Sequence, residues 1–143
     1  MATKYQDDVI NWANEQAAFL RAGNFAALDI EHIADEVEDV GKSEQRELES
    51  RMALLLAHLL KWHVQPERRG SSWETTIRNQ RKAVSMRLKK TPSLKADFGD
   101  EEWWDVAWGD AVYRAEQETD LKDLPPTCPW SADQIMDAGF LPE

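Results

Sequence analysis

The chain has 143 residues and a formal net charge of −10, which is the size of one ordinary domain and disfavours general polyanion binding. Hydrophobic residues at 42% and charged residues at 31% are typical of a globular protein and exclude a disordered or collagen-like chain. The longest apolar run, 52–57, is too short to cross a bilayer, residues 1–8 lack signal-peptide character, and the single cysteine cannot form an internal disulfide. We therefore expect a cytoplasmic protein that has no membrane contact.

The first third of the chain predicts two helices. Apolar residues spaced three and four apart indicate a helix over 6–21, which the turn at 22–24 ends. Asp29 is expected to cap a second helix over 30–40, and Gly41 stands where a left-handed residue would end it. The predicted apolar face of that second helix consists of Ile30, Ile33, Ala34, Val37 and Val40.

The remaining elements are also predicted to be helical. A third helix over 43–64 has apolar residues around most of its circumference and is expected to be the central, most buried element. A capping box at 71–74 begins a fourth helix, 72–90, and a fifth helix covers 100–119. A second capping box at 131–134 begins a short terminal helix. The predicted fold is a single all-α domain, 1–143, built as a compact bundle of five to six mainly antiparallel helices.

Charge is distributed in three blocks. Residues 29–49 hold nine acids and two bases, residues 61–90 hold nine bases and two acids, and residues 91–143 hold thirteen acids and three bases. One interpretation is that acidic and basic helices lie beside one another in the bundle. The other is that the basic segment binds an acidic partner, a phosphate or a nucleic acid. The candidate anion-binding residues are Arg68, Arg69, Trp73, Arg78 and Lys82.

A strip of polar side chains adjoins the apolar face of the predicted third helix. These side chains need hydrogen-bond or ion-pair partners, because an uncompensated buried charge is costly. Glu36, Gln80 and Arg81 on neighbouring helices could supply those partners. The predicted polar network consists of Glu36, Arg51, His58, Lys61, Gln80 and Arg81. It is either an internal lock that fixes the register of three helices, a cleft for a small anion or polar ligand, or a site in which His58 acts as general acid or base.

Known catalytic and metal patterns are mostly missing. The chain has no Glu-x-x-His pair, no glycine-rich phosphate loop and no nucleophile elbow, and Cys128 has no second cysteine. His32 and Glu36 lie one helical turn apart, but no third metal ligand is evident. The sequence therefore predicts no metal, no cofactor and no assigned catalytic residue.

Several blocks of the sequence resemble the bacterial domain-of-unknown-function family 29. They are Leu28 to Glu38 followed by Gly41, Ser50-Arg51, Leu55 to Trp62, Gln65-Pro66, Arg69, Ser72-Trp73, Thr76-Ile77, Gln80-Arg81, Pro92-Ser93-Leu94, Cys128-Pro129-Trp130 and Phe140-Leu141-Pro142. The resemblance spans nearly the whole chain and implies an all-helical small bacterial protein with no established activity.

The function expected from the sequence is that of a non-enzymatic protein-interaction or regulatory module with a protein partner. One alternative is a nucleic-acid, nucleotide or anion binder that uses the basic segment 61–90. Another is an enzyme with a site at Glu36, Arg51 and His58. An oligomer formed through an exposed tryptophan such as Trp103 or Trp130 is a further possibility.

Overall fold

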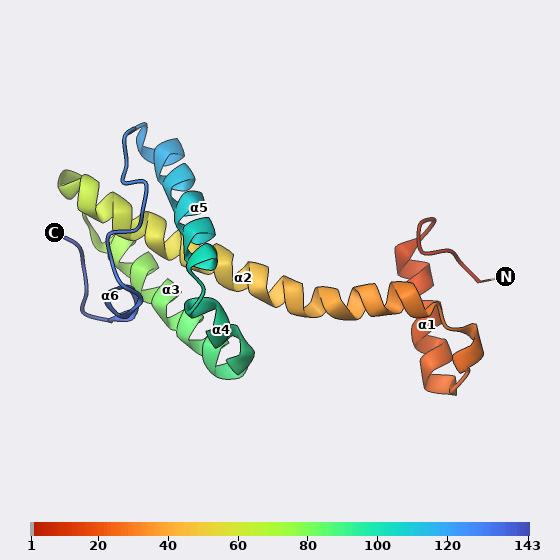
Figure 1. Cartoon of the computed structure of the whole chain (residues 1–143). Coiled ribbons are helices and arrows are strands. Elements are labelled where there is room, and N and C mark those ends of the chain that lie inside the picture. The colour runs from red at the N-terminus through yellow and green to blue at the C-terminus, as the bar shows by residue number, and fades with distance from the viewer. Residues whose placement is uncertain (1) are drawn as a thin grey trace. The chain divides into compact units, whose positions relative to one another are not determined.

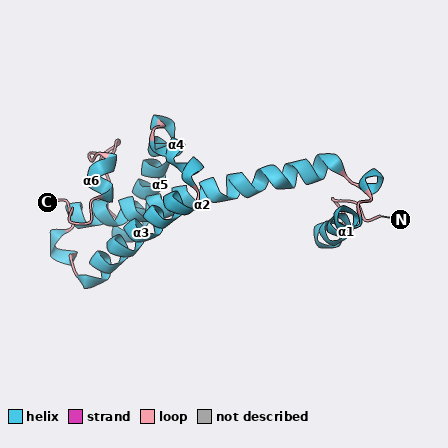
Figure 2. Ribbon diagram, turned by 90° about the horizontal axis from the view of Figure 1, so that it is seen from below, coloured by secondary structure: helices cyan, strands magenta, loops and turns pink. Residues whose placement is uncertain are grey.

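The computed structural model describes residues 2–143, and these form helices and loops with no strand among them (Figures 1 and 2). The helices are α1 (Val9–Ala22), α2 (Ile30–Val64), α3 (Ser71–Lys90), α4 (Lys95–Phe98), α5 (Glu101–Thr119) and α6 (Ala132–Met136). Short 3₁₀ turns occur at Phe25–Ala27, Pro66–Arg68 and Pro92–Leu94. The all-α prediction is confirmed. Within the described residues, every helix is too short or too polar to cross a membrane.

Contacts between residues divide the chain into two compact units. The N-terminal unit, residues 1–44, contains α1, the first 3₁₀ turn and the first part of α2. The C-terminal unit, residues 45–143, contains the rest of α2 and all later elements. Helix α2 therefore contributes to both units, and each unit is described by itself below.

Helix α2 is continuous through Gly41, so the predicted break into two helices at this residue is wrong. The left-handed conformation needed for such a break occurs at one described glycine, Gly23, which ends α1 with a φ of 72°. Glu38, Lys42 and Glu44 near Gly41 are good helix formers, and Glu38 and Lys42 form an ion pair of 4.0 Å across it. One glycine costs a helix interior only about 1 kcal/mol, which by itself is too little to end the helix.

The second part of α2 forms the core of the C-terminal unit, as predicted. Its largest aliphatic residues have no exposed surface: Leu48, Met52, Leu55, Leu56, Leu59 and Leu60. Helix α3 adds Ile77 and Val84 to this core, α5 adds a stripe of alanines with Trp108, and α6 adds Ile135. Because all three helices bury apolar residues in one cluster with α2, this cluster determines how the C-terminal unit is assembled.

The predicted helix caps are partly confirmed. The capping box that begins α6 is present, with Ser131 and Gln134 bonded reciprocally. The box predicted at 71–74 is wrong. Helix α3 begins one residue earlier than expected, after Gly70, so Ser71 lies within the first turn and no side chain caps the helix.

Replacing glycine by alanine should separate a helix-interior position from a left-handed one. At Gly41, an added Cβ has no neighbour within 4 Å, so Gly41→Ala should raise the free energy of unfolding by about 0.5–1 kcal/mol. At Gly23 the positive φ strains any residue that has a side chain, so Gly23→Ala should lower the free energy of unfolding by about 1 kcal/mol. Urea titration followed by circular dichroism measures both. Destabilisation by Gly41→Ala would show that α2 is not a continuous helix in solution.

Candidate interaction site in the N-terminal unit

The predicted polar network is distributed over separate contacts. The guanidinium of Arg51 donates to the side chain of Gln80 at 3.4 Å, so these two predicted members are brought together. Arg51 also pairs with Glu47 at 3.0 Å on its own helix. The prediction that Glu36 joins this group required two packed helices around Gly41. One continuous α2 removes that premise, and Glu36 instead accepts a hydrogen bond from Tyr5.

The other members of the predicted network have partners of their own. Lys61 is buried, forms an ion pair with Glu118 of α5 and lies 5.2 Å from the ring centre of Trp73. The Nδ1 atom of His58 lies 3.0 Å from the carbonyl oxygen of Leu54, one turn earlier. Burial lowers the pKa of His58, and this favours the neutral imidazole. The catalytic set Glu36, Arg51 and His58 is thus not assembled into one reactive group.

Arg81 has a role that the sequence did not indicate. Its guanidinium is buried and donates to the carbonyl oxygens of Ile135 at 2.7 Å, Ala138 at 3.4 Å and Phe140 at 2.6 Å. One side chain therefore attaches the C-terminal segment to α3. Carbonyl partners are invisible in a sequence, because every residue carries one.

The candidate anion-binding residues fall into two groups. Arg69 donates to the carbonyl oxygens of Trp62 at 2.7 Å and Pro142 at 3.3 Å, and Trp73 packs against the core, so these two residues are engaged internally. Arg68 lies exposed in a 3₁₀ turn. Arg78 and Lys82 are exposed on α3, where they line small surface pockets.

Ion pairs join the charge blocks within the C-terminal unit. Glu47 from the first acidic block pairs with Arg87 of the basic block at 3.2 Å. Lys61 of the basic block pairs with Glu118 of the last acidic block. At these positions, the interpretation that acidic and basic helices lie side by side is confirmed.

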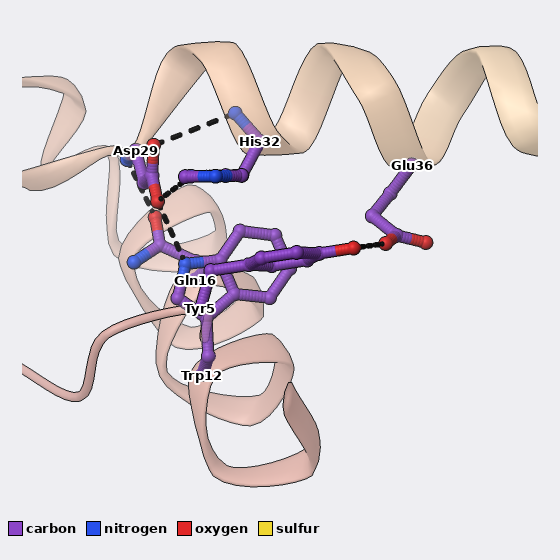
Figure 3. Close-up of polar contacts among 6 residues, drawn as sticks. All are labelled: Tyr5, Trp12, Gln16, Asp29, His32 and Glu36. Atoms are coloured by element: carbon purple, nitrogen blue, oxygen red, sulfur yellow. Dashed lines mark hydrogen bonds and ion pairs between the residues drawn. The ribbon is translucent and has the colours of Figure 1, made fainter. Parts of the chain in front are cut away.

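A polar and aromatic cluster in the N-terminal unit holds α1 against the start of α2 (Figure 3). Asp29 lies at its centre. One carboxylate oxygen accepts from the backbone N–H of His32 at 3.4 Å, which confirms Asp29 as the cap of α2. The other oxygen lies 2.7 Å from Nδ1 of His32 and accepts from the indole N–H of Trp12 at 3.0 Å. The side-chain oxygen of Gln16 accepts from the backbone N–H of Asp29 at 2.8 Å.

Tyr5 completes this cluster from the other side of His32. The Tyr5 ring stacks on the imidazole with centroids 4.3 Å apart and planes 11° apart. The rings of Tyr5 and Trp12 meet edge to face, with centroids 4.9 Å apart. The Tyr5 hydroxyl donates to Glu36 at 2.5 Å, and this bond raises the pKa of the hydroxyl (Figure 3). Desolvation alone would raise the pKa of Asp29, but the hydrogen bonds from His32 and Trp12 outweigh it and lower this pKa.

His32 and Glu36 are therefore engaged with Asp29 and Tyr5 rather than arranged as metal ligands. Among the residues that the structure describes, no three histidine, cysteine or carboxylate side chains are grouped as a metal site. The sequence signals for this cluster were present separately: the cap at Asp29, and Gln16 on an otherwise apolar face. Their combination depends on the register between α1 and α2, which no local pattern specifies.

The apolar face predicted for 30–40 is largely exposed in the structure. Ile30, Val37 and Val40 have exposed fractions of 69%, 66% and 68%, and Ile33 is half-buried. Ala34 is exposed as well, so the expectation that this face packs in the bundle is wrong for four of its five residues. At 100° per residue, the two isoleucines and two valines lie within an arc of about 80° on one face of the helix. We call Ile30, Ile33, Val37 and Val40 the α2 stripe.

Carboxylates lie on both sides of the α2 stripe, at different distances from it. At 100° per residue, Glu36 lies about 40° beyond one edge of the stripe, whereas Glu38 and Glu31 lie about 80° and 100° beyond the other edge, past Ala34. Glu36 is also the residue that Tyr5 contacts, so the α1 contact and the stripe occupy neighbouring faces of α2. The cluster around Asp29 therefore holds α1 on the face of α2 that lies next to the stripe.

Comparison with known proteins places the chain in a family. The family model described as "Domain of unknown function DUF29" matches residues 4–141. The chain belongs to this family. A crystal structure of an alpha-helical protein of unknown function from Rhodospirillum rubrum is similar to this DUF29 chain, with 24% sequence identity and a TM-score of 0.53. The match covers 98% of this chain and 93% of that one, and it supports the fold alone. No curated protein matches the chain.

The hydrogen bond from Asp29 to Gln16 gives a test of the cluster. Gln16 is buried, and Gln16→Met keeps its length and helix propensity but removes the acceptor of the Asp29 N–H. Asp29 is half-buried, and the loss of one such hydrogen bond costs about 0.5–1.5 kcal/mol, so α1 should unfold that much more readily. Hydrogen exchange of the α1 amides measures this. Gln117→Met, at an exposed position of α5, is the matched control. Equal protection in both variants would mean that Gln16 does not hold α1 in place.

Proposed function

We propose that this DUF29 chain is a protein-interaction module and that the α2 stripe binds a basic amphipathic helix of a partner protein. The observation that carries the proposal is the exposure of Ile30, Val37 and Val40 on one face of a helix. Single exposed aliphatic residues are normal on protein surfaces. Four at positions i, i+3, i+7 and i+10 repeat with the helical period, which is the pattern of anchors in helix-in-groove recognition.

The free energy of such binding would come from removing aliphatic surface from water. Burial is worth about 25 cal/mol for each Å² of apolar surface, or about 1.5–3 kcal/mol for a fully covered valine or isoleucine. Three stripe residues are about two-thirds exposed, so most of this gain is still open to a partner. The side chains of a helix present this surface in fixed positions, which limits the entropy lost on binding.

Charge selects the kind of partner. Residues 29–49 hold nine acids and two bases, and Glu36 flanks the stripe directly, with Glu31 and Glu38 farther round the helix. A partner helix with lysine or arginine beside its apolar residues would be attracted to this surface. A second copy of the same surface would bring carboxylates towards carboxylates, so a basic partner is favoured over self-association.

Site-specific crosslinking in the source organism tests the proposal. A benzophenone amino acid at Val37 should give a crosslinked product whose crosslinked segment is a basic amphipathic helix. The same group at Val106, an exposed valine of α5, is the matched control and should not give this product. Charge reversal by Glu31→Lys with Glu38→Lys should reduce the yield from Val37, because the two new positive charges near the stripe would repel a basic partner.

The proposal would be overturned by three results of this experiment. A product formed only with a second copy of the chain would make the stripe a self-interface. A crosslinked segment without basic residues would remove the charge argument. Equal products from Val37 and Val106 would show that the α2 stripe is not special.

A second candidate function, anion binding, is supported by the surface of α3. Two pockets of about 320 and 270 Å³ adjoin one another and share Arg78, Arg81 and Ala138 in their walls. Lys82 lines the smaller one. Arg81 is committed to backbone carbonyls, so Arg78 and Lys82 are the cations available to a phosphate or an acidic side chain.

Charge reversal tests this second function. Arg78→Glu with Lys82→Glu should abolish retention on heparin at low salt, or reduce the dependence of log affinity on log salt by about two, because each lost phosphate contact removes about one. Lys95→Glu with Lys122→Glu changes the net charge equally at exposed sites outside both pockets. If the two double variants behave alike, only net charge matters and α3 has no anion site.

A further inference from the structure

The C-terminal unit contains a further pocket, at the start of α5. The segment that follows α5 folds back along this helix, and the indole N–H of Trp108 donates to the carbonyl oxygen of Pro125 at 2.9 Å (Figure 1). The pocket of about 490 Å³ lies between the first two turns of α5 and residues 127–132. We propose that this pocket binds an alkylated ammonium ion through Trp104, Trp130 and two carboxylates, Glu101 and Asp105.

The charges in the pocket select a cation. Glu101 and Asp105 are four residues apart, so they lie on the same face of α5 one turn apart. Both are exposed, and no lysine or arginine is among the residues that line the pocket. The segment 91–143 holds thirteen acids and three bases, so the surrounding potential also favours a positive ligand.

The aromatic walls select an organic cation over a hydrated metal ion. Trp104 and Trp130 both line the pocket, and indole rings attract alkylammonium groups through their faces. A magnesium or calcium ion prefers a shell of oxygen ligands, which two indole walls do not supply. Its volume lies within the range of about 300–1,000 Å³ found for small-molecule sites.

Both indoles are fixed before a ligand arrives. The N–H of Trp104 donates to the carbonyl oxygen of Phe98 at 2.9 Å, and its ring meets Trp103 edge to face at 5.0 Å. Trp130 packs edge to face against buried Trp108 at 5.8 Å. Rigid aromatic walls lose little entropy when they bind a ligand.

Cys128, which also lines the pocket, does not compete with this chemistry. Its thiol donates to the carbonyl oxygen of Trp130 at 3.5 Å. Burial raises the pKa of this thiol, so it stays protonated at neutral pH and is neither a strong nucleophile nor a good ligand for a soft metal. Cys128 therefore contributes shape to the pocket.

Titration with tetramethylammonium chloride at constant ionic strength tests the proposal. The nuclear magnetic resonance signals of the Trp104 and Trp130 indole N–H groups should shift with saturation, and neopentyl alcohol, a neutral compound of similar shape, should not shift them. Glu101→Gln with Asp105→Asn should weaken binding about tenfold or more, because two charges that face the cation are removed. Glu102→Gln with Asp133→Asn removes the same net charge outside the lining and should leave the affinity unchanged.

A peptide that carries trimethyllysine separates two sources of the ligand. Binding about tenfold tighter than tetramethylammonium would identify a modified side chain of a protein, and equal affinity would identify a free metabolite. Both outcomes support the ammonium site. Equal shifts with the neutral compound, full binding by the Glu101 and Asp105 variant, or no shift at millimolar tetramethylammonium would overturn it. The α2 stripe lies outside this pocket, so failure here leaves the proposed function intact.

Discussion

The burial of the second part of α2 is the interaction on which the C-terminal unit depends. Six large side chains between Leu48 and Leu60 are fully removed from water. Helices α3, α5 and α6 all reach their places by covering this segment. Each of the surface features in this unit follows from that arrangement. The basic pockets of α3 lie where the C-terminal segment crosses it, and the tryptophan pocket lies where the chain returns along α5.

The N-terminal unit is held together differently. Only Trp12 and Gln16 are buried in α1, and the contacts to α2 are mostly hydrogen bonds and ring stacking around Asp29. Such contacts are directional, so they fix the position of α1 without covering much aliphatic surface. This explains how the unit is ordered while the α2 stripe stays exposed. A surface of this kind is suited to a partner, because the apolar area that binding requires has not been used in folding.

The sequence predicted the fold more fully than the sites, for physical reasons. Helical periodicity, the Ser131 capping box and the apolar circumference of residues 48–60 are local signals, and the structure confirms them. Gly41 misled the prediction because a glycine in a helix and a glycine at a helix end look alike in sequence. Arg51 and Gln80, two members of the predicted network, form a hydrogen bond, whereas the partners of Arg81 are backbone carbonyls of a distant segment. The stacking of Tyr5 on His32 depends on a loop path that no periodicity encodes.

The two ends of the chain are attached by groups that respond differently to acid. Arg81 holds the C-terminal segment through a guanidinium that stays charged across the accessible pH range, so this attachment is indifferent to acidification. Asp29 holds α1 as a carboxylate whose pKa is lowered in the folded chain. Its contribution to stability is present above the ordinary aspartate pKa and disappears as the pH falls through the folded value. Acid below the ordinary aspartate pKa therefore loosens α1, which lies beside the α2 stripe, while Arg81 still holds the C-terminal segment.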